Sequence, residues 1–123
     1  MNSERCQFCL IKEKVIQNDL AFVIYDKYPV AEGHALVILK RHVADYFDTT
    51  DEEKRAMQEL AEQIRAIQKE KLFPDGFNIG INCGEAAGQT IFHVHMHVIP
   101  RYKGDMEDPR GGVCGVIPEK QKY

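Results

Sequence analysis

The sequence predicts an α+β fold, because strand-like runs and one long helical segment do not alternate as they do in parallel-sheet proteins. Two strand-like runs precede a helical segment at residues 51–71, and two more follow it. The length of 123 residues is that of one domain. We therefore expect residues 1–123 to form a single domain, with a C-terminal tail from about residue 103.

Four runs of residues have the composition of β-strands. Residues 20–25 and 34–39 are branched and apolar, which is typical of buried strands. Residues 76–82 alternate apolar and small polar side chains, as in a half-buried strand, and residues 91–99 form the longest run. A short pairing segment is also expected at residues 116–118.

The helix has both a start signal and an apolar stripe. Thr50 and Glu53 have the spacing of a capping box, in which two side chains satisfy free backbone N–H groups. Apolar residues recur every three or four positions: Met57, Leu60, Ala61, Ile64 and Ile67. We expect this stripe to pack on the sheet, and a partner-binding helix is the alternative.

Composition excludes several classes of partner. The formal net charge is −3, which argues against binding of long nucleic acids, although a small nucleotide remains possible. The apolar runs are far shorter than the ~20 residues of a membrane span. The first residues lack the apolar region of a signal peptide. A cytoplasmic protein with no membrane contact is therefore expected.

Three of the five histidines lie in one five-residue window of the last strand-like run. Alternate residues of a strand point to the same side, so His93, His95 and His97 should share one face of the sheet. Three neighbouring imidazoles contribute little to sheet stability but suit proton and phosphoryl chemistry. A plain polar face toward solvent is the alternative.

Two kinds of chemistry fit these histidines. They can bind a catalytic zinc, with water in an open position. Alternatively, a neutral imidazole can attack phosphorus as a nucleophile while its neighbours hold the phosphate oxygens. Gln89 and Thr90 supply an amide and a hydroxyl for the second reaction, and Gly84 and Gly88 allow close approach of the backbone.

These motifs resemble the histidine triad (HIT) family of nucleotide hydrolases and transferases. The resemblance covers nearly the whole chain and rests on residues 33–38, 40–42, 88–90 and 93–99 and on Asn82. It implies a HIT-like fold, with an antiparallel sheet of about five strands and one long helix. It also implies a homodimer with a joined sheet.

The resemblance implies a catalytic role for three histidines. His95 would attack the α-phosphate and form a covalent nucleotidyl-histidine. His97 would contact the same phosphate and assist the leaving group or the incoming water, and His34 would support both from the adjacent strand.

Further residues would bind the nucleotide. Asp26 would hold the ribose hydroxyls, although capping of a turn is an equal alternative. Gln89, Thr90 and Asn82 would contact the phosphate together with His95 and His97. Candidates for the apolar slot of the base are Phe8, Leu10 and Leu36, for which core packing is the alternative.

The four cysteines are interpreted as thiols or metal ligands, since no secretion signal favours disulfides. Cys6 and Cys9 have the spacing of two zinc ligands, and a closed site needs two more. The resemblance implies a structural zinc held by these cysteines with His42 and His93. A redox pair of cysteines is the alternative. No catalytic metal is expected.

The expected function is hydrolysis of a nucleoside phosphoramidate that releases a nucleoside 5′-monophosphate such as AMP. The expected partner is therefore a purine nucleotide such as AMP, or a nucleoside phosphoramidate. One alternative is hydrolysis of dinucleoside polyphosphates, for which Arg101, Lys103 and Arg110 would supply positive charge. A non-catalytic nucleotide-binding module and a metal-dependent hydrolase are the remaining alternatives.

Overall fold

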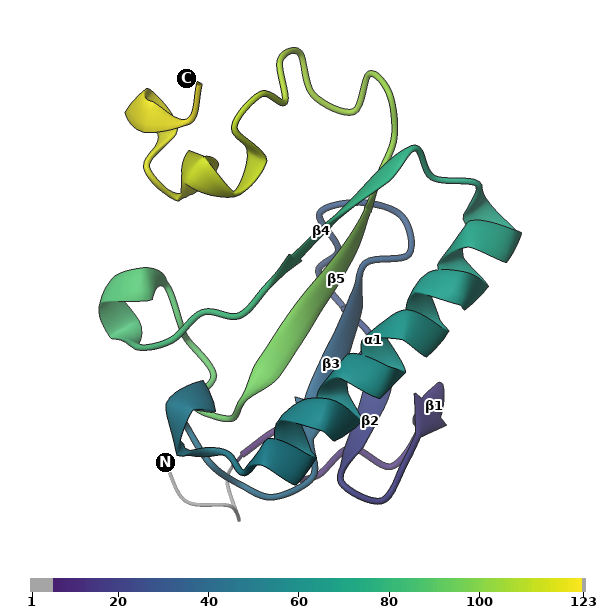
Figure 1. The fold of residues 1–123 in the computed structure, drawn as a ribbon, viewed down its shortest axis with the longest axis vertical. Coiled ribbons are helices and arrows are strands. Elements are labelled where there is room, and N and C mark those ends of the chain that lie inside the picture. Colours follow the sequence, from purple (N-terminus) through teal and green to yellow (C-terminus); the bar gives the residue numbers. More distant parts are fainter. Residues whose placement is uncertain (1–5, 123) are drawn as a thin grey trace.

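The computed structural model describes residues 6–122, which form one antiparallel sheet with a long helix against one face (Figure 1). The strands lie in the order β1-β2-β3-β5-β4, and each neighbouring pair is antiparallel. Their bounds are β1 Ile16–Gln17, β2 Ala21–Tyr25, β3 Ala35–Leu39, β4 Gly76–Gly80 and β5 His95–Arg101. The helix α1 spans Asp51–Leu72.

The α+β architecture, the four expected strands and the helix are confirmed, and β1 is an additional strand. The capping box is also confirmed, because Thr50 Oγ1 accepts the Glu53 N–H and Glu53 Oε1 accepts the Thr50 N–H. The two-residue β1 escapes detection because so short a segment has no periodicity to recognise.

The last strand differs most from its expected range of 91–99. It begins at His95 because the N–H groups of residues 93 and 94 bond outside the sheet: the His93 N–H donates to the Ile91 carbonyl and the Val94 N–H to the Val43 carbonyl. The Val94 carbonyl still accepts the Leu39 N–H of β3. It continues through Pro100 to Arg101, which were expected to end it. Pairing of β5 with β3 stops at Val98, so the proline lies on a one-sided part of the strand, where a missing N–H is tolerated.

The pairing segment expected at residues 116–118 is wrong. The tail instead forms two 3₁₀ helices, at Gly112–Val116 and Pro118–Lys120. Pro118 stands in the first turn of the second one, where its fixed φ and missing N–H favour a helical start. The tail lies on the side of the sheet away from α1 (Figure 1).

The helix covers one face of the sheet and forms the main core. Its expected stripe packs as predicted, with Met57, Leu60 and Ile64 fully buried against β2, β3 and β5. An ion pair ties its first turn to the segment after β3, because Arg41 contacts both carboxylate oxygens of Glu53 at 2.8 and 2.9 Å. This pairing holds the pKa of Glu53 at about 2.

The opposite face carries a smaller apolar cluster and most of the histidines. Cys6 and Phe8 of the N-terminal segment cover Phe22, Leu36 and Ile38 on that face. The remaining part of the face, along β5 and β4, is not covered by α1 (Figure 1). Within residues 6–122, no helix is long and apolar enough to cross a membrane.

Candidate active site and metal centre

Three histidines meet on the face opposite α1. His95 and His97 project from β5, and the strand register places Leu36 beside His97, two residues after His34. The ring centroids of His95 and His97 are 5.2 Å apart, and those of His34 and His97 are 5.1 Å apart. The expected shared face is therefore confirmed for His95 and His97, while His93 precedes the strand.

The hydrogen bonding of His95 leaves one ring nitrogen available. Its Nδ1 lies 2.7 Å from the carbonyl oxygen of His93, which can only accept, so Nδ1 carries the proton. Burial lowers the pKa of His95, with the His93 carbonyl and Asp26 opposing the shift. The neutral ring therefore keeps a lone pair on Nε2, which is the form required of a nucleophile.

The protonation of His97 is set by a chain of two hydrogen bonds. The Val30 N–H donates to His34 Nδ1 at 3.2 Å, so the proton of a neutral His34 lies on Nε2. His34 Nε2 is 2.9 Å from His97 Nδ1, which must accept. A neutral His97 therefore carries its proton on Nε2, where it is available to a bound ligand.

The site keeps these rings uncharged. Burial, then the neighbouring His95 and His34, lowers the pKa of His97 to about 4, and Asp26 only partly opposes this. Burial also lowers the pKa of His34, again against the influence of Asp26. At neutral pH the rings therefore act as hydrogen-bonding groups and bases rather than as cations.

Asp26 caps the turn, as one of its two expected roles requires. Its Oδ1 accepts the Tyr28 N–H at 2.9 Å. Its Oδ2 lies 3.5 Å from His34 Nε2, so the same carboxylate also borders the histidines. Binding of the ribose hydroxyls stays a prediction.

The loop between β4 and β5 holds the other expected phosphate ligands. Gln89 is buried, and its amide donates to the carbonyls of Ala44 and Ile91 while Oε1 accepts the Gly84 N–H. Its polar atoms thus brace the loop. Thr90 is exposed, and Asn82 is half-buried beside His34 and His97.

The three residues expected around the base are placed differently from one another. Phe8 is buried, with its ring centroid 4.9 Å from that of His95 in an edge-to-face arrangement, and Leu36 is buried in the same cluster. Leu10 is 61% exposed and belongs to neither that cluster nor the described cavities.

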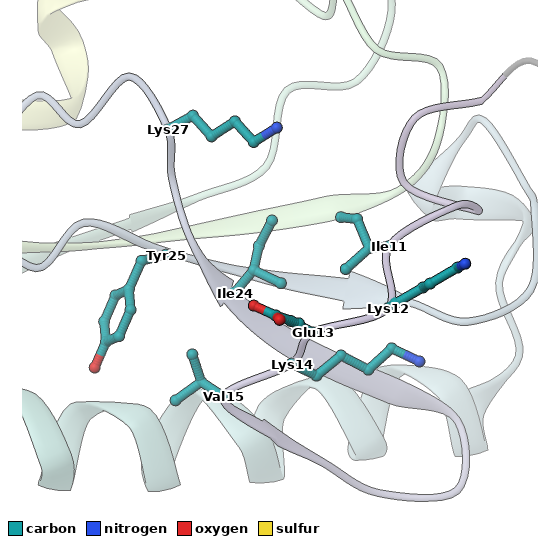
Figure 2. A pocket seen from close by; sticks show the side chains of 8 residues that line it. All are labelled: Ile11, Lys12, Glu13, Lys14, Val15, Ile24, Tyr25 and Lys27. Carbon is teal, nitrogen blue, oxygen red and sulfur yellow. The ribbon is translucent and has the colours of Figure 1, made fainter.

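A cavity of about 490 Å³ opens where residues 11–15 separate from β2 (Figure 2). Ile11 and Ile24 lie next to each other in it, and Lys27 extends above them (Figure 2). The same three residues line an adjoining hollow that contains Asp26. Sequence reasoning missed Ile11 and Ile24, although Ile24 shares a face with Phe22 by strand alternation.

A second cavity, of about 630 Å³, lies on the other side of His97. His34, His97 and Asn82 line it together with β4 and the tail residues Val113 and Val116. Among the described residues, none that line this cavity is an acid, a lysine or an arginine.

Two of the basic residues considered for binding a polyphosphate form ion pairs with carboxylates of this chain. Arg101 contacts both oxygens of Asp105 at 2.7 and 2.8 Å and also donates to Asn78. Arg110 pairs with Asp108 at 3.1 Å.

Cys6, Cys9, His42 and His93 meet at one point, and their ligand atoms all lie within 4.8 Å of one another. The Nδ1 atoms of His42 and His93 are 3.2 Å apart, and the sulfur–nitrogen distances are 3.3 to 3.5 Å. Tetrahedral zinc bonds of ~2.3 Å to sulfur and ~2.0 Å to nitrogen give edges of about 3.3–3.5 Å between such atoms. The four residues thus form a possible zinc site.

The surroundings of His93 support the same assignment. Its Nε2 faces the Leu39 carbonyl, which fixes the proton there and leaves the Nδ1 lone pair directed at the two sulfurs and His42. Burial and the adjacent Cys6 raise the pKa of Cys9 to about 11. A bound cation would remove this cost by stabilising the thiolate.

Comparisons with known proteins agree with this arrangement. A model of the HIT domain matches residues 10–104. An uncharacterized 16.1 kDa HIT-like protein of Mycoplasma pneumoniae is 42% identical over 109 residues, which cover 84% of this chain and 76% of that protein. A bis(5′-adenosyl)-triphosphatase of Dictyostelium discoideum is 40% identical over 90 residues, which cover 73% of this chain and 60% of the relative.

The structure is also similar to that of a zinc-bound histidine triad family protein from Mycobacterium smegmatis. The TM-score is 0.78 at 38% identity, and the match covers 87% of this chain and 82% of the other.

The zinc site can be tested by metal content and stability. We expect the purified chain to hold about one zinc ion, and Cys9→Ser to lose it, because a closed site needs four ligands. Loss of the ion should lower Tm by about 5 °C or more, since zinc binding contributes to folding. Elemental analysis and thermal unfolding measure both effects.

Cys114→Ser is the matched control, because Cys114 is an exposed thiol in the tail. Equal zinc content in Cys9→Ser and Cys114→Ser would contradict the site.

Proposed function

The chain belongs to the HIT domain family, and on that premise we propose that it hydrolyses a nucleotide through a covalent bond between His95 and phosphorus. The observation that carries this proposal is the state of the two β5 rings. His95 presents an Nε2 lone pair, and the neighbouring His97 presents an Nε2–H. A nucleophile beside a hydrogen-bond donor is the pair that such a displacement needs.

In the first step, His95 Nε2 attacks the α-phosphorus, and the bond from phosphorus to the leaving group breaks. The Nε2–H of His97 donates a hydrogen bond to the departing atom, and solvent water supplies the proton that keeps an amine from leaving as an anion. The Nδ1–H of His95 stays bonded to the His93 carbonyl, which stabilises the positive charge on the substituted ring.

In the second step, water attacks the same phosphorus and the bond from phosphorus to His95 breaks. The proton of the attacking water passes to solvent, while His97 keeps its Nε2–H and donates a hydrogen bond to the phosphate. The products are a nucleoside 5′-monophosphate and the two histidines in their starting states.

The nucleotide would occupy the N-terminal side of the site. Asp26 would accept hydrogen bonds from the ribose hydroxyls, and Ile11 and Ile24 would contact the base over the buried Phe8 and Leu36. Asn82 and Thr90 would reach the phosphate, and Gln89 would shape the loop that carries them.

The leaving group would enter the 630 Å³ cavity beyond His97. A dinucleoside polyphosphate brings several negative charges, whereas this cavity offers no formal positive charge among its described lining residues. Apolar walls suit an uncharged alkyl or aromatic amine. This composition supports a phosphoramidate as the preferred substrate over a polyphosphate.

A catalytic metal at the histidines is less well supported. Asp26, His34 and His97 form the second cluster of possible ligands in the described part of the chain. His34 Nδ1 accepts from the Val30 N–H, so coordination through Nε2 would require loss of the only ring proton.

We further propose that two copies join their sheets at β4. The sheet ends in β1 and β4, and β4 has the longer free edge, with Ile79 half exposed. Unpaired edge strands of this kind readily pair with another chain. Light scattering of the purified chain measures the mass, and a monomer at micromolar concentration would contradict this proposal.

Substitution of the nucleophile tests the covalent mechanism. His95→Asn keeps a side-chain N–H for the His93 carbonyl but removes the attacking lone pair. We expect kcat to fall by about a thousandfold or more, with AMP binding retained. Mass spectrometry of quenched wild-type reactions should detect nucleotide on the chain and none on the variant.

Lys69→Ala, on the exposed face of α1, serves as the control and should turn over normally. Unchanged turnover by His95→Asn would overturn the mechanism. Binding of AMP with no turnover of any substrate by the wild type would favour the non-catalytic module.

The leaving-group preference is tested by competing substrates. We expect kcat/KM for an adenosine phosphoramidate with an apolar amine to exceed that for diadenosine triphosphate by about tenfold or more. The double variant Val113→Lys, Val116→Lys adds positive charge to the cavity wall. It should lower the ratio of kcat/KM for the phosphoramidate to kcat/KM for diadenosine triphosphate. Steady-state kinetics on both substrates gives the ratio.

Ile117→Lys provides a matched control, because Ile117 is exposed in the same tail and does not line the cavity. Faster turnover of the polyphosphate by the wild type would reverse the preference.

A further inference from the structure

Gln68 is a polar residue within the apolar stripe of α1. It is 1% exposed, and its amide group donates to the carbonyls of Gly33 at 2.9 Å and Val98 at 3.2 Å. Its Oε1 is buried without a hydrogen-bond partner. The side chain therefore bridges two strands' backbones from the face that packs on the helix.

The two carbonyls adjoin the pair of histidines on the opposite face. Gly33 immediately precedes His34, and Val98 immediately follows His97. The rings of His34 and His97 are themselves linked at 2.9 Å. Gln68 thus holds the two backbone segments whose side chains form that link.

The turn at Gly33 is built for this close approach. Gly33 has φ +83°, and a Cβ there would lie 2.3 Å from Leu72 Cδ1 of α1. This left-handed φ favours glycine, and any larger residue would also have to displace the Leu72 side chain. The same turn is fixed by the Asp26 N–H, which donates to the His34 carbonyl at 2.9 Å.

Gln68 combines one unpartnered oxygen with two donated hydrogen bonds. A buried carbonyl oxygen without a partner costs about 1–3 kcal/mol. A methionine of similar length would avoid that cost but would leave the Gly33 and Val98 carbonyls without the donors that Gln68 supplies. What the glutamine adds is a fixed distance between Gly33 and Val98. Hydrogen-bonded ring pairs lose function when displaced by about 0.5 Å.

We propose that Gln68 is a positioning residue, which holds the His34–His97 ring pair in register from the far side of the sheet. The proposal rests on the role proposed above for His97 as a hydrogen-bond donor to the reacting groups. It assigns Gln68 no contact with the substrate.

Gln68→Met tests the proposal, because it keeps the volume and removes both donors. We expect kcat to fall about tenfold with KM within about twofold, as for a misplaced catalytic group. The pKa of His97, about 4 in the native chain, should rise as the rings separate and water enters. Kinetics and an NMR titration of the histidine rings measure these effects.

Ile64→Val is the matched control, because Ile64 is fully buried in the same stripe and contacts neither carbonyl. It should lower stability while leaving the titration of His97 and kcat near the native values. A Gln68→Met protein that behaves like Ile64→Val in both measurements would overturn the proposal.

Gln68→Glu provides a second variant. Burial raises the pKa of such a carboxyl, and its neutral form keeps one donor. We expect its His97 titration to lie between those of the native chain and Gln68→Met, and coincidence with Gln68→Met would count against the proposal. The titration needs no substrate, so it separates the two proposals. If the native chain has no hydrolase activity but Gln68→Met still shifts the pKa of His97, the proposed function is refuted and the positioning role is retained.

Discussion

The hydrogen bond between the rings of His34 and His97 determines what the rest of the site can do. Its direction follows from a backbone group, because the Val30 N–H occupies His34 Nδ1 and sends the ring proton to Nε2. His97 must then accept on Nδ1 and expose Nε2–H. The antiparallel register of β3 and β5 brings the two rings together, so the positions of the ring protons depend on the pairing of the sheet.

The possible zinc centre and the candidate nucleophile are coupled through one residue. The His93 side chain faces the cysteines, while its carbonyl accepts the Nδ1–H of His95. A ligand set that fixes the position of His93 therefore also fixes which nitrogen of His95 is free. The strand β5 begins directly after these residues: the His93 side chain joins the cluster, and the Val94 N–H donates to the Val43 carbonyl while the Val94 carbonyl accepts from Leu39 of β3.

Residue periodicity predicted the helix, its cap and the two faces of the last strand, since these depend on local geometry. The candidate zinc ligands His42 and His93 followed from family resemblance, because no spacing rule joins residues so far apart in the chain. Ile11, Ile24 and Gln68 were not predicted. Each has an ordinary apolar or helical context, and its importance depends on which segment approaches it in three dimensions.

The cavity beyond His97 takes part of its wall from residues 112–116, a segment outside the sheet. The histidines, by contrast, are set by strand pairing and by the buried contacts behind them. Mutations in the tail can therefore accumulate without disturbing the reacting groups. In evolutionary terms, the function proposed above would let a lineage of such proteins exchange the molecule released as second product while the histidine strand stays the same.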